Sequence, residues 1–211
     1  MICNFTPGKF TTTQEAIIQE AADKWGQVLN DNRTLTVDID TFPSNSNVLA
    51  SAGPLSLDSA TEMPNTGQAK FGLGHMNGNG VKMDTEIIPG TNKSVLYYVA
   101  VHEFCHILGI GTLWNWGSRD LIKDQKTGVS YNPAPATMPA DADPVFVGPI
   151  AASKLSNIIG YSVSAVPVEL EGGPGTSLSH LEESGFGHAG TGNGSRDIFV
   201  PTSVHPDGKV C

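Results

Sequence analysis

The chain has 211 residues, of which only 16% are charged, and 21 Asp and Glu against 12 Lys and Arg leave a net charge of −9. An acidic chain without a cluster of cations is a poor ligand for nucleic acid or anionic membranes, because phosphate contacts need Lys and Arg. Its longest apolar run, 94–111, is interrupted by His102, Glu103 and His106, so no uninterrupted stretch of ~18 apolar residues is present to span a bilayer. With 24 Gly and 14 Pro, the composition predicts a globular, loop-rich protein.

The N-terminal half shows helix and strand patterns in turn. Three threonines at 11–13 precede apolar residues at helical spacing, which predicts a helix over 14–29. Alternating or short apolar runs predict strands over 34–42, 48–57 and 68–73. A second, strongly apolar helix is expected over 95–108, with Ser94 as its N-cap and Gly109 at its end.

The sequence changes character after Gly111, where long polar and proline-rich stretches begin. We expect a shorter helix over 149–159, one helical turn at 180–183 and a last strand over 197–200. These patterns predict an α+β protein with two subdomains. Residues 1–111 would form an N-terminal α+β half that ends with the apolar helix, and residues 112–211 an irregular C-terminal half.

The apolar helix carries the motif H-E-x-x-H, formed by His102, Glu103 and His106. Residues four apart lie on one face of a helix, about 6 Å apart along its axis, so both imidazoles can bind one Zn²⁺. Glu103 is rotated off that line and can reach a water molecule without being a ligand. This arrangement is typical of zinc hydrolases, in which a carboxylate takes the proton of the attacking water.

Two histidines leave one protein ligand to be found. The motif continues to Gly109, but the position where the long metzincin pattern has a third histidine is Thr112. From the residues alone, the candidates are downstream carboxylates and the remaining histidines, which are His75, His180, His188 and His205.

Three segments resemble the leishmanolysin family of metzincin zinc peptidases. These are V-H-E-F-C-H-I-L-G-I-G-T-L-W at 101–114, F-V-G-P at 146–149 and V-P-V-E-L-E-G-G-P-G-T-S-L-S-H at 166–180. In that family an insertion follows the glycine of the motif, and the third zinc-binding histidine follows a G-G-x-G-T segment. The resemblance, which covers roughly residues 10–186, therefore implies a metzincin-like fold, with a twisted N-terminal sheet, a backing helix and an active-site helix, and His180 as the third ligand. From the residues alone, His188, in a glycine-rich loop eight residues past His180, is the rival third ligand.

The chain departs from the family at two positions. The family resembles other metzincins in having a methionine beneath the zinc, but no methionine follows His180 here, and Phe199 is the candidate for that place. The tryptophan that usually follows the third histidine is Leu181.

The resulting expectation is a zinc metalloendopeptidase with Glu103 as general base, acting on a protein or peptide. The substrate would lie extended along an edge strand, for which 68–73 is the candidate, and Tyr131 or Tyr161 would assist the oxyanion. The alternative is a zinc-binding structural or interaction module with an inactive site. The low charge favours a secreted or cell-surface protein. We expect a monomer, with a disulfide between Cys3 and Cys211 as one pairing of the terminal cysteines.

Overall fold

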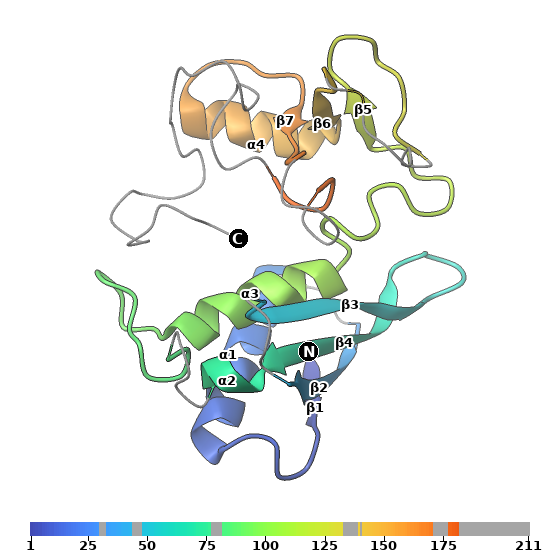
Figure 1. Ribbon diagram of the computed structural model, residues 1–211. Helices are drawn as coiled ribbons and strands as arrows, with labels where there is room; N and C mark the ends of the chain where they lie inside the picture. Colours follow the sequence, from blue (N-terminus) through green and yellow to red (C-terminus); the bar gives the residue numbers. More distant parts are fainter. Residues whose placement is uncertain are drawn as a thin grey trace. The chain divides into compact units, whose positions relative to one another are not determined.

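The computed structural model describes residues 1–29, 33–43, 48–76, 82–132, 139, 141–170 and 177–181 (Figure 1). Its contacts divide the chain into two units, the first over Met1–Ile110 and the second beginning at Gly111. Helices and strands occur in both, which confirms the predicted α+β class. No helix among these residues has both the length and the apolar character needed to cross a membrane.

The first unit is built on a four-stranded mixed sheet. Its strands are β1 (Ile2–Phe5), β2 (Thr36–Phe42), β3 (Ala50–Leu57) and β4 (Pro64–Gly72), in the order β1-β2-β4-β3. β1 and β4 flank β2 in parallel, and β3 pairs with β4 antiparallel. The prediction of 68–73 as an edge strand is wrong, because β4 is bonded on both sides and the strands at the two edges are β1 and β3.

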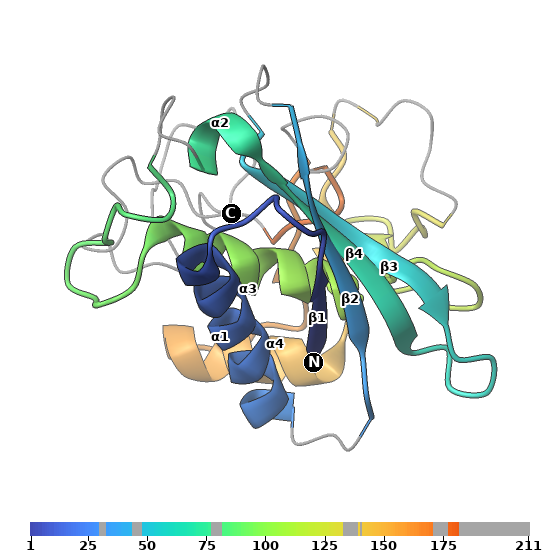
Figure 2. The same ribbon diagram turned by 90° about the horizontal axis from the view of Figure 1, so that it is seen from below.

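Two helices lie on one side of this sheet (Figure 2). α1 (Thr12–Leu29) begins two residues earlier than predicted, after a capping box: Gln14 N–H donates to Thr11 Oγ1 (3.3 Å), and Thr11 N–H donates to Gln14 Oε1 (2.9 Å). α3 (Val95–Ile107) begins where Ser94 Oγ accepts a hydrogen bond from Tyr97 N–H (3.4 Å), as predicted. A short helix, α2 (Leu73–Met76), follows β4.

The core of the first unit lies between these helices and the sheet. Its largest fully buried side chains include Ile18, Ile39, Phe71 and Phe104, from α1, β2, β4 and α3. α3 crosses β4 at Gly67, where a Cβ atom would overlap Cγ2 of Ile107. The missing side chain of Gly67 thus sets how closely the helix that carries the H-E-x-x-H motif approaches the sheet.

The second unit contains a small antiparallel sheet and one helix. Its elements are β5 (Ile122–Asp124), β6 (Pro144–Phe146), α4 (Pro149–Ile159) and β7 (Val166–Pro167), with strand order β5-β6-β7. α4 has the predicted bounds, with Pro149 in its first turn and Gly160 in the left-handed region (φ 82°) at its end. The C-terminal part of the chain was expected to be irregular, and the presence of this sheet shows that the expectation is wrong for residues 122–124, 144–146 and 166–167. Its strands have only two or three residues, too few for a detectable alternation.

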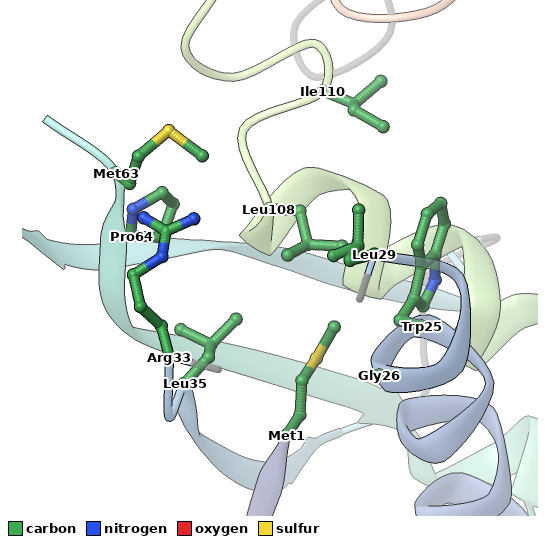
Figure 3. Close-up of a pocket in the computed structure, with 10 residues that line it drawn as sticks. All are labelled: Met1, Trp25, Gly26, Leu29, Arg33, Leu35, Met63, Pro64, Leu108 and Ile110. Atoms are coloured by element: carbon green, nitrogen blue, oxygen red, sulfur yellow. The ribbon is translucent and has the colours of Figure 1, made fainter. Parts of the chain in front are cut away.

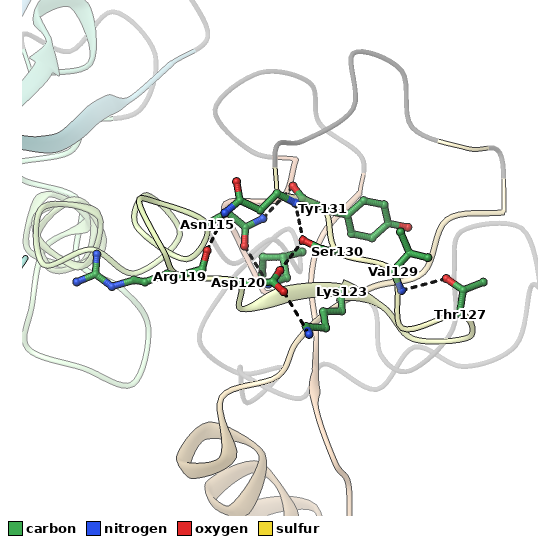
Figure 4. Close-up of polar contacts among 10 residues, drawn as sticks. Asn115, Arg119, Asp120, Lys123, Thr127, Val129, Ser130 and Tyr131 are labelled. Carbon is green, nitrogen blue, oxygen red and sulfur yellow. Dashed lines mark hydrogen bonds and ion pairs between the residues drawn. The ribbon is translucent and has the colours of Figure 1, made fainter.

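Buried and half-buried polar side chains fix the loops around β5. Asn115 accepts from Ile122 N–H and donates to the Tyr131 carbonyl, both at 3.0 Å. Asp120 accepts a hydrogen bond from Ser130 and pairs with Lys123 (Figure 4). The backbone groups of an irregular segment must find partners somewhere, and here polar side chains supply many of them.

Two further expectations concern the chain ends. The helical turn predicted at 180–183 is wrong in its described part, because Leu181 forms an antiparallel bridge with Val168. The predicted strand 197–200 and Cys211 lie outside the described residues. Cys3 and Cys105 are free thiols, and burial raises the pKa of each to about 12.

Candidate metal centre

α3 brings the two histidines of the motif together. Nε2 of His102 and Nε2 of His106 are 3.0 Å apart, and the rings meet edge to face with their centroids 4.6 Å apart. Two nitrogens bound to one tetrahedral zinc at 2.0–2.1 Å would be about 3.3 Å apart. The pair therefore has nearly the spacing that a shared metal ion requires.

The hydrogen bond of His106 defines which of its nitrogens can bind a cation. Nδ1 lies 3.0 Å from the carbonyl oxygen of Ile110. Because a carbonyl only accepts, Nδ1 carries the hydrogen and Nε2 carries the lone pair. Burial lowers the pKa of His106, and this outweighs the opposite effect of the Ile110 carbonyl. Only 8% of the residue is exposed, so the neutral, ligand form is favoured.

Glu103 is a buried carboxylate with an unsatisfied oxygen. The residue is 5% exposed, and its burial raises the pKa to about 8. Within the described part of the chain, no group forms a hydrogen bond with its Oε2. A buried carboxylate needs a cation, a donor or water nearby. The two imidazoles and this oxygen together fit a bound divalent cation and a water molecule.

Neighbouring groups hold the face of α3 that carries the two histidines in place. Trp25 of α1 donates its indole N–H to the carbonyl of Val101 (2.9 Å), the residue before His102. At the other end, Gly109 has φ 101°, a conformation open mainly to glycine. That turn returns the chain so that the Ile110 carbonyl reaches His106. The role predicted for Gly109, ending the helix, thus extends to orienting a ligand.

His180 lies just after a tight turn in the second unit. It belongs to a short ladder with Glu169, in which Glu169 N–H donates to the His180 carbonyl (3.0 Å) and Leu178 N–H donates to the Glu169 carbonyl (2.8 Å). One ligand atom from each of His102, His106 and His180 can be chosen so that all lie within 4.8 Å of one another. These three histidines are therefore close enough to bind one metal ion.

The other residues that the sequence suggested for the site are either placed elsewhere or lie outside the described residues. His75 lies on α2, outside this group of three, while His188, His205 and Phe199 lie outside the described residues. Tyr131 donates its hydroxyl to buried Asp124 (2.9 Å), so the oxyanion role suggested for it is unsupported.

Glu169 was not singled out from the sequence, although its Oε2 lies 3.6 Å from Nδ1 of His180. The feature of the sequence that could have identified Glu169 is its position as the one charged residue in the apolar run V-P-V-E-L at 166–170.

An apolar pocket of about 230 Å³ lies at the C-terminal end of α3. Figure 3 shows Met63, Pro64 and Arg33 facing Trp25 and Leu29 across it. Its lining includes Leu108 and Ile110 but none of the three polar residues of the motif. This pocket therefore lies beside the turn that follows His106. It is not the place where water would be activated.

No protein-family model matches the chain, and comparison with curated proteins finds no match. The side chains of the candidate metal centre are therefore the basis for inferring a function.

Proposed function

We propose that the protein is a zinc metalloendopeptidase related to the leishmanolysin-like metzincins. The observation that carries the proposal is the geometry of the motif on α3: two Nε2 atoms 3.0 Å apart, with a buried, incompletely hydrogen-bonded glutamate between them in the chain. A third histidine, His180, supports it, because one of its ligand atoms lies within 4.8 Å of a ligand atom of each of the other two. Three imidazoles are a donor set that suits zinc and leaves a fourth position for water or substrate.

His102, His106 and His180 would hold the ion in this proposal. Bound zinc supplies a Lewis acid for the scissile carbonyl and lowers the pKa of water to about 7. Glu103 accepts the proton of the attacking water at a carboxylate oxygen and then gives it to the leaving amine. The hydrogen bond from His106 Nδ1 to Ile110 keeps that ring in one tautomer throughout.

The substrate would be an extended segment of a protein or peptide. β3 is one of the two edge strands of the first sheet and the one that contacts α3, so it replaces 68–73 as the candidate for pairing with such a segment. Edge strands present unpaired N–H and C=O groups that bind extended peptides without reading their side chains. A secreted or cell-surface location, expected from the low charge, suits this activity and belongs to the same proposal.

The second candidate is a zinc-binding module that has lost hydrolysis. The sequence feature that favours it is the lack of any methionine after His180, where the resembling family has a methionine that packs beneath the metal. Zinc content alone does not separate the two candidates, because both bind the ion.

Glu103→Gln tests the proposal with a denatured, fluorescently labelled protein as substrate. We expect one zinc per chain in wild type and variant, and a loss of cleavage of about 10²–10⁴-fold in the variant. Glu86→Gln is the matched control, since Glu86 is exposed in the same unit, and it should cleave as wild type does. Equal, negligible cleavage by wild type and Glu103→Gln, with zinc bound to both, would leave the inactive module as the function.

A further inference from the structure

We propose that Glu169 is the positioning residue of the third metal ligand: its carboxylate receives the Nδ1 hydrogen of His180 and so directs Nε2 to the metal. This inference rests on the proposed function, because it concerns the same site. It assigns a role to a residue that does not bind the ion or the substrate.

The backbone places Glu169 beside His180. Their main chains are joined by the 3.0 Å bond from Glu169 N–H to the His180 carbonyl, and Val168 bridges Leu181. Val168 N–H in turn donates to the Pro144 carbonyl of β6 (3.0 Å). The carboxylate is therefore presented by a short ladder that is anchored to the small sheet.

The side chains meet in a largely desolvated place. Nδ1 of His180 lies 3.6 Å from Oε2 of Glu169, and the two side chains are only 15% and 16% exposed. A movement of about 0.5 Å would bring these two atoms within hydrogen-bond distance of each other. At such burial a carboxylate is costly unless it has a fixed partner, and the imidazole is a partner that the ladder holds in front of it.

The backbone is strained two residues before His180, which indicates a constraint on where His180 points. Leu178 has φ 60°, in the left-handed region that non-glycine residues rarely adopt. Its N–H donates to the Glu169 carbonyl. Strain of this kind persists where the surroundings fix a conformation, and it gathers at functional sites.

A carboxylate behind a histidine ligand has a defined chemical effect. Histidine ligands usually donate their second N–H to an oxygen, which fixes the tautomer and makes the metal-binding nitrogen more basic. His106 has such an acceptor in the Ile110 carbonyl. Glu169 would do the same for His180, with the added effect of a negative charge opposite the cation.

The test compares zinc affinity, by competition with a chelator, in wild type, Glu169→Gln and Glu169→Ala. We expect the dissociation constant to rise about tenfold in the first variant and up to about 100-fold in the second. Asp141→Asn removes an exposed carboxylate from the same unit and should leave the constant unchanged. In nitrogen-15 NMR spectra of the zinc-loaded proteins, the Nδ1–H signal of His180 should shift between wild type and Glu169→Gln, while that of His106 stays.

The outcomes separate this inference from the proposed function. If wild type binds no zinc, both fail. If wild type binds one zinc and Glu169→Gln binds it equally well, only the role of Glu169 fails. If Glu169→Gln holds no zinc at saturation, Glu169 is itself a ligand and the positioning role is overturned. A metal-free Glu169→Gln protein that melts more than about 2 °C below wild type would make the pair a structural one, against the proposal.

Discussion

Replacing Asp124 with asparagine should destabilise the second unit by about 2–4 kcal/mol. Asp124 Oδ1 accepts from Lys126 N–H (3.1 Å) and from both N–H and Oγ1 of Thr127 (2.8 Å each). Oδ2 accepts from the Tyr131 hydroxyl (2.9 Å) and from Asp143 N–H (3.0 Å). With the residue 8% exposed, water cannot easily replace these donors.

The magnitude follows from what asparagine would present to the same donors. Its amide oxygen can keep the three bonds of Oδ1, but its NH₂ group would face Asp143 N–H, a second donor. A buried donor left without an acceptor costs about 1–3 kcal/mol, and the loss of charge weakens the remaining bonds by about 1 kcal/mol in all. Tyr131 can turn its hydroxyl to accept instead of donate, which limits the loss.

The stabilisation also depends on pH. Burial alone would raise the pKa of Asp124, but hydrogen bonds from Thr127, Asp143 and Tyr131 outweigh it and hold the pKa well below its usual range. A carboxyl with a lowered pKa in the folded state stabilises the protein above the pKa of the unfolded chain, about 3.9. The difference between wild type and Asp124→Asn should therefore be constant above about pH 5 and shrink as the pH falls further.

Urea denaturation followed by tryptophan fluorescence measures the effect, because Trp114 packs in the same core as Tyr131. Asp141→Asn, at an exposed site, should stay within about 0.5 kcal/mol of wild type. A loss below 1 kcal/mol in Asp124→Asn, or a difference from wild type that persists undiminished at pH 3, would refute this account of the Asp124 carboxylate.

Three further predictions concern the core, the ligands and one tyrosine. Gly67→Ala should lower stability by about 1–3 kcal/mol in thermal melts, because its Cβ would press on α3, whereas Gly53→Ala, with no atom within 4 Å of the added Cβ, should not. His180→Ala should release zinc and His188→Ala should retain it; the reverse result in metal analysis would exchange the two assignments. Tyr131, whose pKa is raised to about 12 by burial and by Asp124, should stay protonated at pH 11 in absorbance titrations. The stability this gives is complete below pH 10 and is lost as the pH rises through 12.

Local patterns predicted the three longest helices, α1, α3 and α4, well, but not the short helix α2. Ser94 and Gly109 bracket α3, and Pro149 and Gly160 bracket α4, because capping depends on a few adjacent residues. The H-E-x-x-H geometry was predictable for the same reason, since residues four apart on a helix face one way whatever the rest of the chain does.

The strands were harder to predict because pairing is not local. Ile2–Phe5 was not recognised as a strand; its role as β1 depends on parallel pairing with β2, far along the chain. The position of β4 at the centre of the sheet is likewise set by partners on both sides. Small buried residues such as Gly67 and Ala69 look like a weak strand in the sequence, yet the missing side chain of Gly67 is what allows α3 to pack closely.

In the candidate metal centre, too, the residues placed by local structure were predictable from the sequence and the others were not. His102 and His106 are aligned by one helix, and their supporting oxygen, the Ile110 carbonyl, comes from the turn that ends it. His180 has no such local framework, because it lies on an irregular part of the chain just after a turn, so spacing alone could not select it from the other histidines. A ligand on an irregular segment needs a support of its own to keep one orientation. The Glu169 carboxylate, held 3.6 Å from Nδ1 by the ladder to His180, is the group that meets this need.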